Sequence, residues 1–203
     1  MHSVTGIYLF FRVADMDLGE EKKLVRQARK SPDAFAQLYD QYYPKIFGYV
    51  LRRSANIEAA QDITSETFLK ALGKLWQFQW RNVPFSSWLY KIAANETNQY
   101  FRKAEYRKSV SLEELQERGL ELLSSHDPEG ELIEAQEKLK QHQDFLEIQK
   151  KIVQLPAKYQ EVIALRFFEK KQINEIAEIL GKREGTIKSL LHRALDKLRE
   201  TEE

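Results

Sequence analysis

The residues between positions 183 and 193 are the ones whose types and spacing best suit a defined chemistry. Ile187, Leu191, Ala194 and Leu198 recur three and four residues apart, which indicates the buried face of a helix. The residues between them are polar, small or cationic. On the opposite face, short polar groups can reach base edges and cations can neutralise phosphates. We therefore predict a DNA-binding helix in which Lys188 and Arg193 can neutralise phosphates and Ser189 and His192 can reach bases.

The segment before this helix has the pattern of the first helix of a helix-turn-helix. Ile173, Ile176, Ala177 and Leu180 form one apolar stripe, and Gly181 follows where a helix commonly ends in a left-handed conformation. Periodicity alone fits an ordinary helical hairpin with a solvated face equally well. The glycine turn and the cationic outer face favour DNA binding.

A second group of residues, between positions 76 and 103, combines aromatic rings with cations and amides. All three tryptophans of the chain lie between positions 76 and 88. Aromatic faces stack on unpaired bases while cations follow the phosphates, and such a loop can hold a flipped base. The alternative for Trp88 and Ile92, which we favour, is a place in the hydrophobic core. We predict single-stranded DNA contacts from Phe78, Trp80, Arg81, Asn82, Asn95, Asn98 and Arg102.

A third group lies along the exposed side of a helix expected over residues 57–76. Asp62, Glu66, Leu69 and Gly73 are four, three and four residues apart, whereas the residues expected to be buried lie on the other side. A leucine inside an acidic stripe suggests a protein-binding surface, with an apolar anchor and charges that guide the partner. The alternative is a solvated face with one exposed leucine, which is common.

Several classes of protein are excluded or disfavoured by composition. The chain has no cysteine, so disulfides and thiolate metal sites are excluded, and a reducing cytoplasmic location fits best. Its four histidines are scattered, and no phosphate-binding glycine loop, metal cluster or nucleophile–base pair is present, so we expect no metal, no cofactor and no enzymatic activity. The apolar run at residues 7–11 is too short for a membrane span. With a net charge of only +1, any DNA surface must come from local charge separation.

These residues must be positioned by helices, and we predict an all-α fold of two small domains. We expect an N-terminal extension over residues 1–18, a first domain over 19–106, a linker over 107–147 and a helix-turn-helix domain over 148–203. Residues 107–144 carry five Lys and Arg against ten Asp and Glu, and a Ser-, Pro- and Gly-containing break lies at 124–130. We therefore expect the linker to be flexible and acidic.

The residues at 34–43, 62–71 and 85–95 resemble domain 2 of bacterial sigma factors of the extracytoplasmic-function (ECF) type. Residues 155–198, with Glu175-Ile176-Ala177, Leu180-Gly181 and Gly185-Thr186-Ile187-Lys188-Ser189, resemble domain 4 of the same family. The likeness covers roughly residues 30–105 and 148–200. Each motif is only moderately specific, but both in this order are highly so.

The resemblance implies a factor that directs core RNA polymerase to promoters. Asp62, Glu66 and Leu69 match the surface that docks on the clamp coiled coil of the largest subunit, and the flap of the second-largest subunit is a further expected partner. Domain 2 of the family melts the −10 element and captures a flipped base, and Phe78 to Phe85 and Asn95 match that region. Domain 4 reads the −35 element through a recognition helix, here Arg183 to Arg193. The resemblance thus implies −35 contacts from Arg183, Glu184, Gly185, Thr186, Lys188, Ser189, His192 and Arg193. An anti-sigma factor is usual in this family and is expected here. The acidic linker would follow the active cleft and the RNA exit path.

Two positions depart from the family pattern. Ser65 stands where Gln is frequent, which puts part of the polymerase contact in doubt, and Leu190 stands where Arg is frequent, which removes one phosphate contact. An alternative function is a stand-alone DNA-binding regulator that uses the helix-turn-helix alone, with the N-terminal domain as a dimerisation or sensor module. Such a regulator needs neither the acidic stripe nor the tryptophan-rich loop.

Overall fold

The computed structural model describes residues 16–80, 84–110 and 148–200. Within these ranges every regular element is helical, which confirms the predicted all-α class. Residues 1–15 of the expected extension and residues 111–147 of the expected linker lie outside the described residues. The flexibility and acidity of the linker therefore remain predictions.

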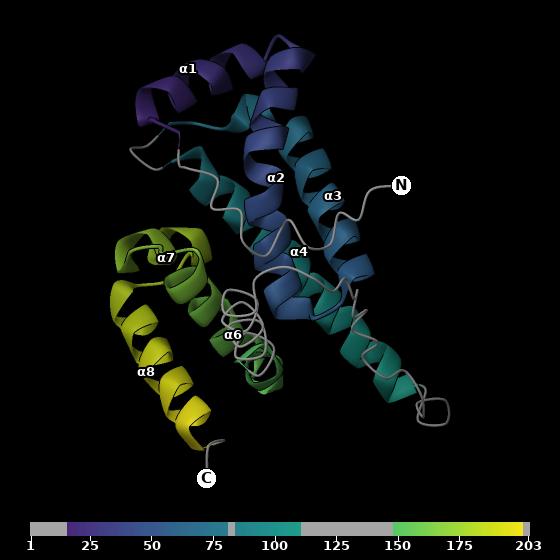
Figure 1. The fold of residues 1–203 in the computed structure, drawn as a ribbon, viewed down its shortest axis with the longest axis vertical. Coiled ribbons are helices and arrows are strands. Elements are labelled where there is room, and N and C mark those ends of the chain that lie inside the picture. The colour runs from purple at the N-terminus through teal and green to yellow at the C-terminus, as the bar shows by residue number, and fades with distance from the viewer. Residues whose placement is uncertain (1–15, 81–83, 111–147, 201–203) are drawn as a thin grey trace, which may run out of the picture.

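The N-terminal domain consists of α1 (Leu18–Ala28), α2 (Pro32–Ser54), α3 (Ile57–Lys74), the short 3₁₀ helix η1 (Leu75–Gln77) and α4 (Phe85–Val110). Helices α2, α3 and α4 pack on one another along their lengths, and α1 packs across one end of this bundle (Figure 1). Side-chain caps explain where the helices begin. Ser31 accepts a hydrogen bond from the Ala34 amide ahead of Pro32, and Asn56 accepts one from the Ala59 amide at 2.8 Å.

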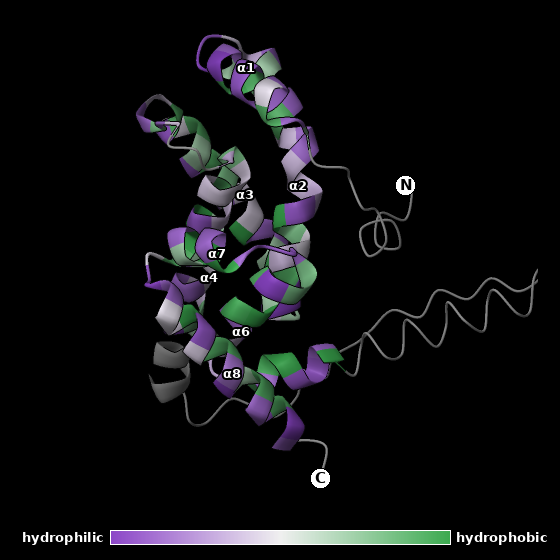
Figure 2. Cartoon of the chain, turned by 90° about the vertical axis from the view of Figure 1, so that its left-hand side faces the viewer, coloured by the Kyte–Doolittle hydropathy of each residue, from purple (hydrophilic) through white to green (hydrophobic). Residues whose placement is uncertain are grey.

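The predicted two-sidedness of α3 is confirmed. The residues predicted to be buried are all buried, and those of the acidic stripe are all exposed. In Figure 2, hydrophilic and hydrophobic residues alternate along each helix, as expected where one stripe faces a shared core. The buried set is Ala60, Thr64, Phe68, Ala71 and Leu75.

A buried carboxylate fixes α1 on the bundle. Glu21 is 2% exposed and accepts hydrogen bonds from the Tyr42 hydroxyl and from the Ser86 amide, the latter at 3.3 Å. Because Ser86 lies in the first turn of α4, Glu21 satisfies an amide that has no partner within that helix and places a negative charge at its positive end. Ser86 is the second residue of α4, which begins at Phe85.

The C-terminal domain has helical residues at 148–154, then α6 (Ala157–Ile163), the π-helical segment η2 (Ala164–Phe168), α7 (Ile173–Leu180) and α8 (Glu184–Glu200). Gly181 ends α7 with a φ of 62°, so the predicted left-handed turn is confirmed. Both Ile176 and Ile179 are buried, whereas the predicted stripe omitted Ile179.

The two domains pack against each other. Helices α6 and α7 and the segment η2 contact α2 and α4, while α8 packs on α6 and α7 at the far side of the C-terminal domain (Figure 1). The face of α4 that carries part of the predicted DNA surface is therefore close to the C-terminal domain.

Candidate DNA and polymerase surfaces

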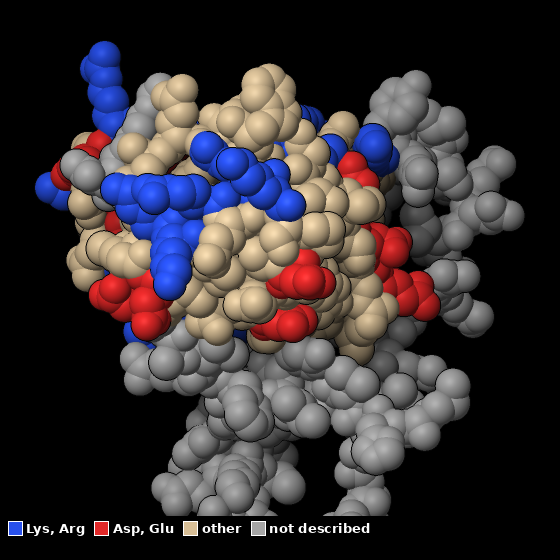
Figure 3. Space-filling model, turned by 90° about the horizontal axis from the view of Figure 1, so that it is seen from above, with Lys and Arg blue, Asp and Glu red and all other residues tan. Residues whose placement is uncertain are grey.

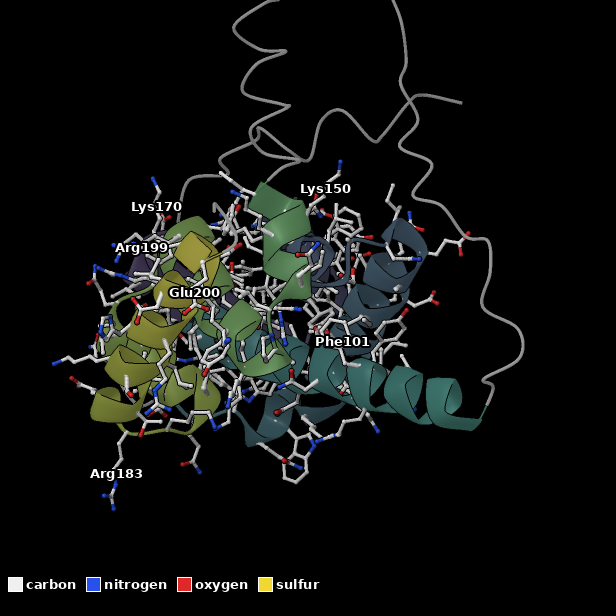
Figure 4. The ribbon with its side chains drawn as sticks, turned by 90° about the horizontal axis from the view of Figure 1, so that it is seen from below. Phe101, Lys150, Lys170, Arg183, Arg199 and Glu200 are labelled. Atoms are coloured by element: carbon white, nitrogen blue, oxygen red, sulfur yellow. The ribbon has the colours of Figure 1, made fainter. Side chains whose placement is uncertain are left out.

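Helix α8 presents its predicted contact residues to solvent. Ile187 and Ala194 are fully buried against α6 and α7, and all eight residues predicted to contact DNA are exposed. Arg183, at the start of the helix, points away from the body of the protein in Figure 4. His192 lies 3.6 Å from Asp196 on the exposed face. The helix is therefore anchored on one side and open on the other, as insertion into a groove requires.

The tryptophan-rich segment is divided between core and surface. Phe78 is only 7% exposed, and its ring packs edge-on against that of Phe85 with ring centroids 5.4 Å apart, so the residue belongs mostly to the core. Trp80 is half-buried, and Trp88 packs on the core as expected. Arg81 and Asn82 lie outside the described residues.

A cavity of about 290 Å³ opens beside Phe78 and Gln79. Its walls come from the segment before α4, from the first turns of α4, and from Glu178 of the C-terminal domain. The lysine and the half-exposed tryptophan that line it are a cation and a ring of the kind that bind an unpaired base. The complete lining is Gln77, Phe78, Gln79, Pro84, Ser87, Trp88, Lys91 and Glu178.

The three predicted contact residues on α4 do not share one environment. Asn95 and Arg102 are exposed. Asn98 is half-buried, and its amide group donates a hydrogen bond of 2.8 Å to Glu161 on α6 while accepting one of 2.6 Å from Arg53 on α2. Asn98 thus joins the two domains, an environment that the sequence did not reveal.

Arg53 is the centre of this inter-domain network. The residue is 1% exposed, and its guanidinium also donates to the Tyr49 hydroxyl at 3.0 Å and lies 4.0 Å from Glu161. Burial raises the pKa of Tyr49, so the hydroxyl stays neutral. A buried charge needs such partners to be tolerated. The sequence did contain one signal that Arg53 is buried. Arg53 lies seven residues after Ile46 and three after Val50, on the buried face of α2.

A second set of polar contacts lies beside the first. Glu169, just after η2, pairs with Arg52 and accepts a hydrogen bond from the Tyr90 hydroxyl. Lys171 donates to the Ser86 hydroxyl at 3.2 Å and lies over the Tyr90 ring. The C-terminal domain therefore contacts the N-terminal one through buried charged and polar groups as well as apolar packing.

The acidic stripe on α3 lies on the surface of the N-terminal domain. Leu69 is 64% exposed, and Leu72, nearly one turn further along, is also exposed. Lys70 lies between the stripe and α4, 3.3 Å from Glu66 and 2.5 Å from Glu96. The hydrogen bond to Glu96, followed by contacts with Glu66, raises the pKa of Lys70. Because Leu72 was not predicted to belong to this surface, the apolar part of the stripe is larger than expected.

Among the described residues, none of the helices combines the length and apolar character that crossing a bilayer demands. In the same part of the chain, His, Asp and Glu side chains nowhere gather in a group of three or more able to hold a metal ion.

Two family models match the chain, in the order expected for the two domains. Residues 38–107 match sigma-70 region 2, and residues 145–198 match sigma-70, region 4. The chain is 35% identical over 179 residues to the ECF RNA polymerase sigma factor SigW of Bacillus subtilis, covering 88% of this chain and 94% of SigW. It is 32% identical over 190 residues to the ECF sigma factor BldN of Streptomyces coelicolor, covering 90% of this chain but 66% of BldN.

Two solved structures share the fold. CnrH, in complex with the cytosolic domain of CnrY, aligns with a TM-score of 0.64 at 18% identity, over 89% of this chain and 96% of that one. The sigma factor RpoE of Bartonella quintana, in complex with the anti-sigma factor NepR, aligns with a TM-score of 0.62 at 25% identity, over 82% of this chain and 94% of that one.

Proposed function

This chain belongs to the ECF sigma factors, non-enzymatic proteins that direct transcription initiation, and we propose that its N-terminal domain recognises the −10 element and its C-terminal domain the −35 element. One observation carries most of this proposal. Helix α8 buries Ile187, Leu191 and Ala194 of its apolar face, while every predicted contact residue on the other face is exposed. The residues assigned to the −35 element are those eight, from Arg183 to Arg193.

The −10 element is assigned to the surface around the loop before α4. Trp80, Asn95 and Arg102 are accessible, and the neighbouring cavity of about 290 Å³ has room for a base turned out of the strand. Phe78 contributes mainly by shaping this cavity, and Arg81 and Asn82 keep their assignment from sequence alone. Asn98 can reach DNA only when its bonds to Glu161 and Arg53 are broken, which requires the C-terminal domain to move away from α4.

The acidic stripe on α3 is proposed to dock on the clamp coiled coil of the largest polymerase subunit. The support is its combination of the exposed Leu69 with Asp62 and Glu66, an apolar anchor flanked by charges. The flap of the second-largest subunit is proposed to hold the C-terminal domain at the distance of the −35 element. An anti-sigma factor is also proposed as a partner, because the two solved relatives include one with such a protein bound.

Binding to core RNA polymerase tests the docking surface. Leu69→Ala is expected to weaken binding at least 10-fold, because truncating a central apolar anchor commonly costs about 2 kcal/mol. Leu18→Ala is the matched control, since Leu18 on α1 is similarly exposed and lies outside the stripe. Equal affinities of the two variants, measured by titration of labelled protein with core enzyme, would contradict this docking site.

Binding to duplex DNA distinguishes a sigma factor from a stand-alone DNA-binding regulator. A sigma factor should bind a −35 duplex poorly by itself and specifically within the holoenzyme, whereas a regulator binds tightly without polymerase. Tight, sequence-specific binding by the isolated protein, unaffected by core enzyme, would favour the regulator.

A further inference from the structure

We propose that α1 and the segment after α3 form an additional contact for single-stranded DNA, next to the proposed −10 surface. The contact is a notch of about 410 Å³, called here the α1 notch. It rests on the proposed function, because the strand it binds is the one opened at the −10 element. Its defining residues are Lys22, Arg26, Arg29, Trp76, Trp80 and Phe78.

The two sides of the α1 notch offer different chemistry. Lys22, Arg26 and Arg29 are four and three residues apart, so they follow one face of α1 and the turn after it, and all three are exposed. The opposite side carries Trp76, which is 72% exposed, and the half-buried Trp80. Cations beside accessible indole rings are what a phosphate backbone with unstacked bases requires.

The walls of the notch are held in place before any ligand binds. The Trp76 indole donates a hydrogen bond of 3.1 Å to the Gly73 carbonyl, and the Arg29 guanidinium donates to the Phe78 carbonyl. The Lys22 ammonium lies 5.9 Å from the centre of the Trp80 ring. On the other face of α1, Glu21 ties the helix to α4. A preformed site gives up less conformational entropy when it binds.

The exposed residues around α1 carry more positive than negative charge, although the chain is nearly neutral overall. Figure 3 shows Lys and Arg side chains gathered over this end of the molecule. Of the three acidic residues in the same segment, Glu21 is buried and only Asp17 and Glu20 are exposed. The five exposed cations are Lys22, Lys23, Arg26, Arg29 and Lys30.

Continuity with the proposed −10 surface selects single-stranded DNA as the occupant. Phe78 and Gln79 line both the α1 notch and the cavity beside α4, so the two hollows lie on either side of one short segment. A strand that is opened at the cavity and crosses this segment arrives at the notch. Stacking on Trp76 needs unpaired bases, which duplex DNA does not supply.

The test compares two double variants in holoenzyme, each lacking two cations from the same segment. Lys22→Ala/Arg26→Ala alters the notch, and Lys23→Ala/Lys30→Ala is the control because neither residue lines it. Affinity is measured by fluorescence anisotropy for a single-stranded non-template oligonucleotide that contains the −10 element and its flanks, across a salt series. All four residues are exposed, so both variants should fold, which circular dichroism and thermal unfolding verify.

The notch variant is expected to bind more weakly than the control. Its slope of log affinity on log salt should be shallower by about 1.4, because each phosphate that a cation no longer neutralises reduces the slope by about 0.7. Trp76→Ala is expected to weaken binding by about 5- to 150-fold while leaving the slope unchanged, because stacking is not ionic. Both results support the proposed DNA site independently of each other.

Three outcomes overturn the proposal. The first is identical affinity and slope for the two double variants. The second is weaker binding of the notch variant to core polymerase without DNA, which makes the surface a protein contact. The third is a wild-type holoenzyme that does not bind the oligonucleotide, which contradicts the proposed −10 function as well, whereas the first two leave that function intact.

Discussion

The two surfaces assigned to DNA differ in how they are built. The proposed −35 surface lies on helix α8 and on Arg183 just before it, with every assigned residue exposed and the helix held by its buried face. The −10 surface combines a loop with one side of α4, and its members range from the buried Phe78 to the exposed Asn95. Every residue of the proposed −35 surface is accessible, whereas Asn98 of the proposed −10 surface is held by hydrogen bonds to Arg53 and Glu161.

Because of this difference, we expect the proposed −10 and −35 surfaces to differ in how accessible they are to DNA in the free protein. The C-terminal domain packs on the N-terminal one through α6, α7 and η2, and α8 remains on the outer side. The packing between domains therefore engages Asn98 of the proposed −10 surface and leaves the proposed −35 surface open. Variants that weaken this packing, or that change one surface at a time, test the comparison directly.

The largest effect is expected from Glu169→Ala. The change removes the partner of the mostly buried Arg52 and of the Tyr90 hydroxyl, which should cost the domain interface about 3–5 kcal/mol. The distance between the domains is measured by energy transfer between dyes at cysteines introduced at Lys23 and Arg199, since the chain has no cysteine of its own. Energy transfer should fall for Glu169→Ala and stay constant for the exposed control Glu200→Ala. An unchanged signal for both variants would show that Glu169 does not hold the domains together.

A smaller effect is expected from Arg193→Ala on the −35 surface. If the guanidinium contacts a base, holoenzyme should lose about 1–3 kcal/mol of binding free energy at the preferred −35 sequence and discriminate less well at one position. The control Arg199→Ala changes an exposed arginine on the same helix outside the assigned set, near Asp196. Competition binding with promoter DNA that carries single-base-pair changes measures the binding free energy and the discrimination at each position. A weakening that is uniform across sequences, with a shallower salt dependence, would reassign Arg193 to a phosphate.

The smallest effect is expected for the two asparagines of α4, Asn95 and Asn98, which lie in different environments. Asn98→Ala should lower the free energy of unfolding by about 1–2 kcal/mol, because Arg53 and Glu161 are each deprived of a hydrogen bond. Asn95→Ala should leave stability within about 0.5 kcal/mol and slow promoter opening more than closed-complex binding. Urea unfolding and permanganate footprinting provide the two readouts. If both variants had the same profile, the distinction between the exposed and the inter-domain position would be wrong.

The sequence predicted those features that depend on one helix at a time. The two faces of α3 and of α8 follow from the spacing of apolar residues, and the glycine turn between α7 and α8 follows from Gly181. Features that depend on distant segments were missed. Arg53 was not recognised as buried, since nothing in its neighbours indicates that Glu161, more than 100 residues away, supplies the opposite charge. Glu21 and the α1 notch were missed for the same reason.

The most direct test of the central claim is run-off transcription with purified core RNA polymerase on the promoter upstream of the gene for this protein. If two domains of one polymerase-bound chain read the −35 and −10 elements together, a single specific transcript should appear only when this protein is added. Insertion of about five base pairs between the elements should abolish it, since half a helical turn moves one element to the other side of the DNA. Specific initiation that persists unchanged after the insertion, or no specific initiation from any promoter in a broad library, would contradict the account.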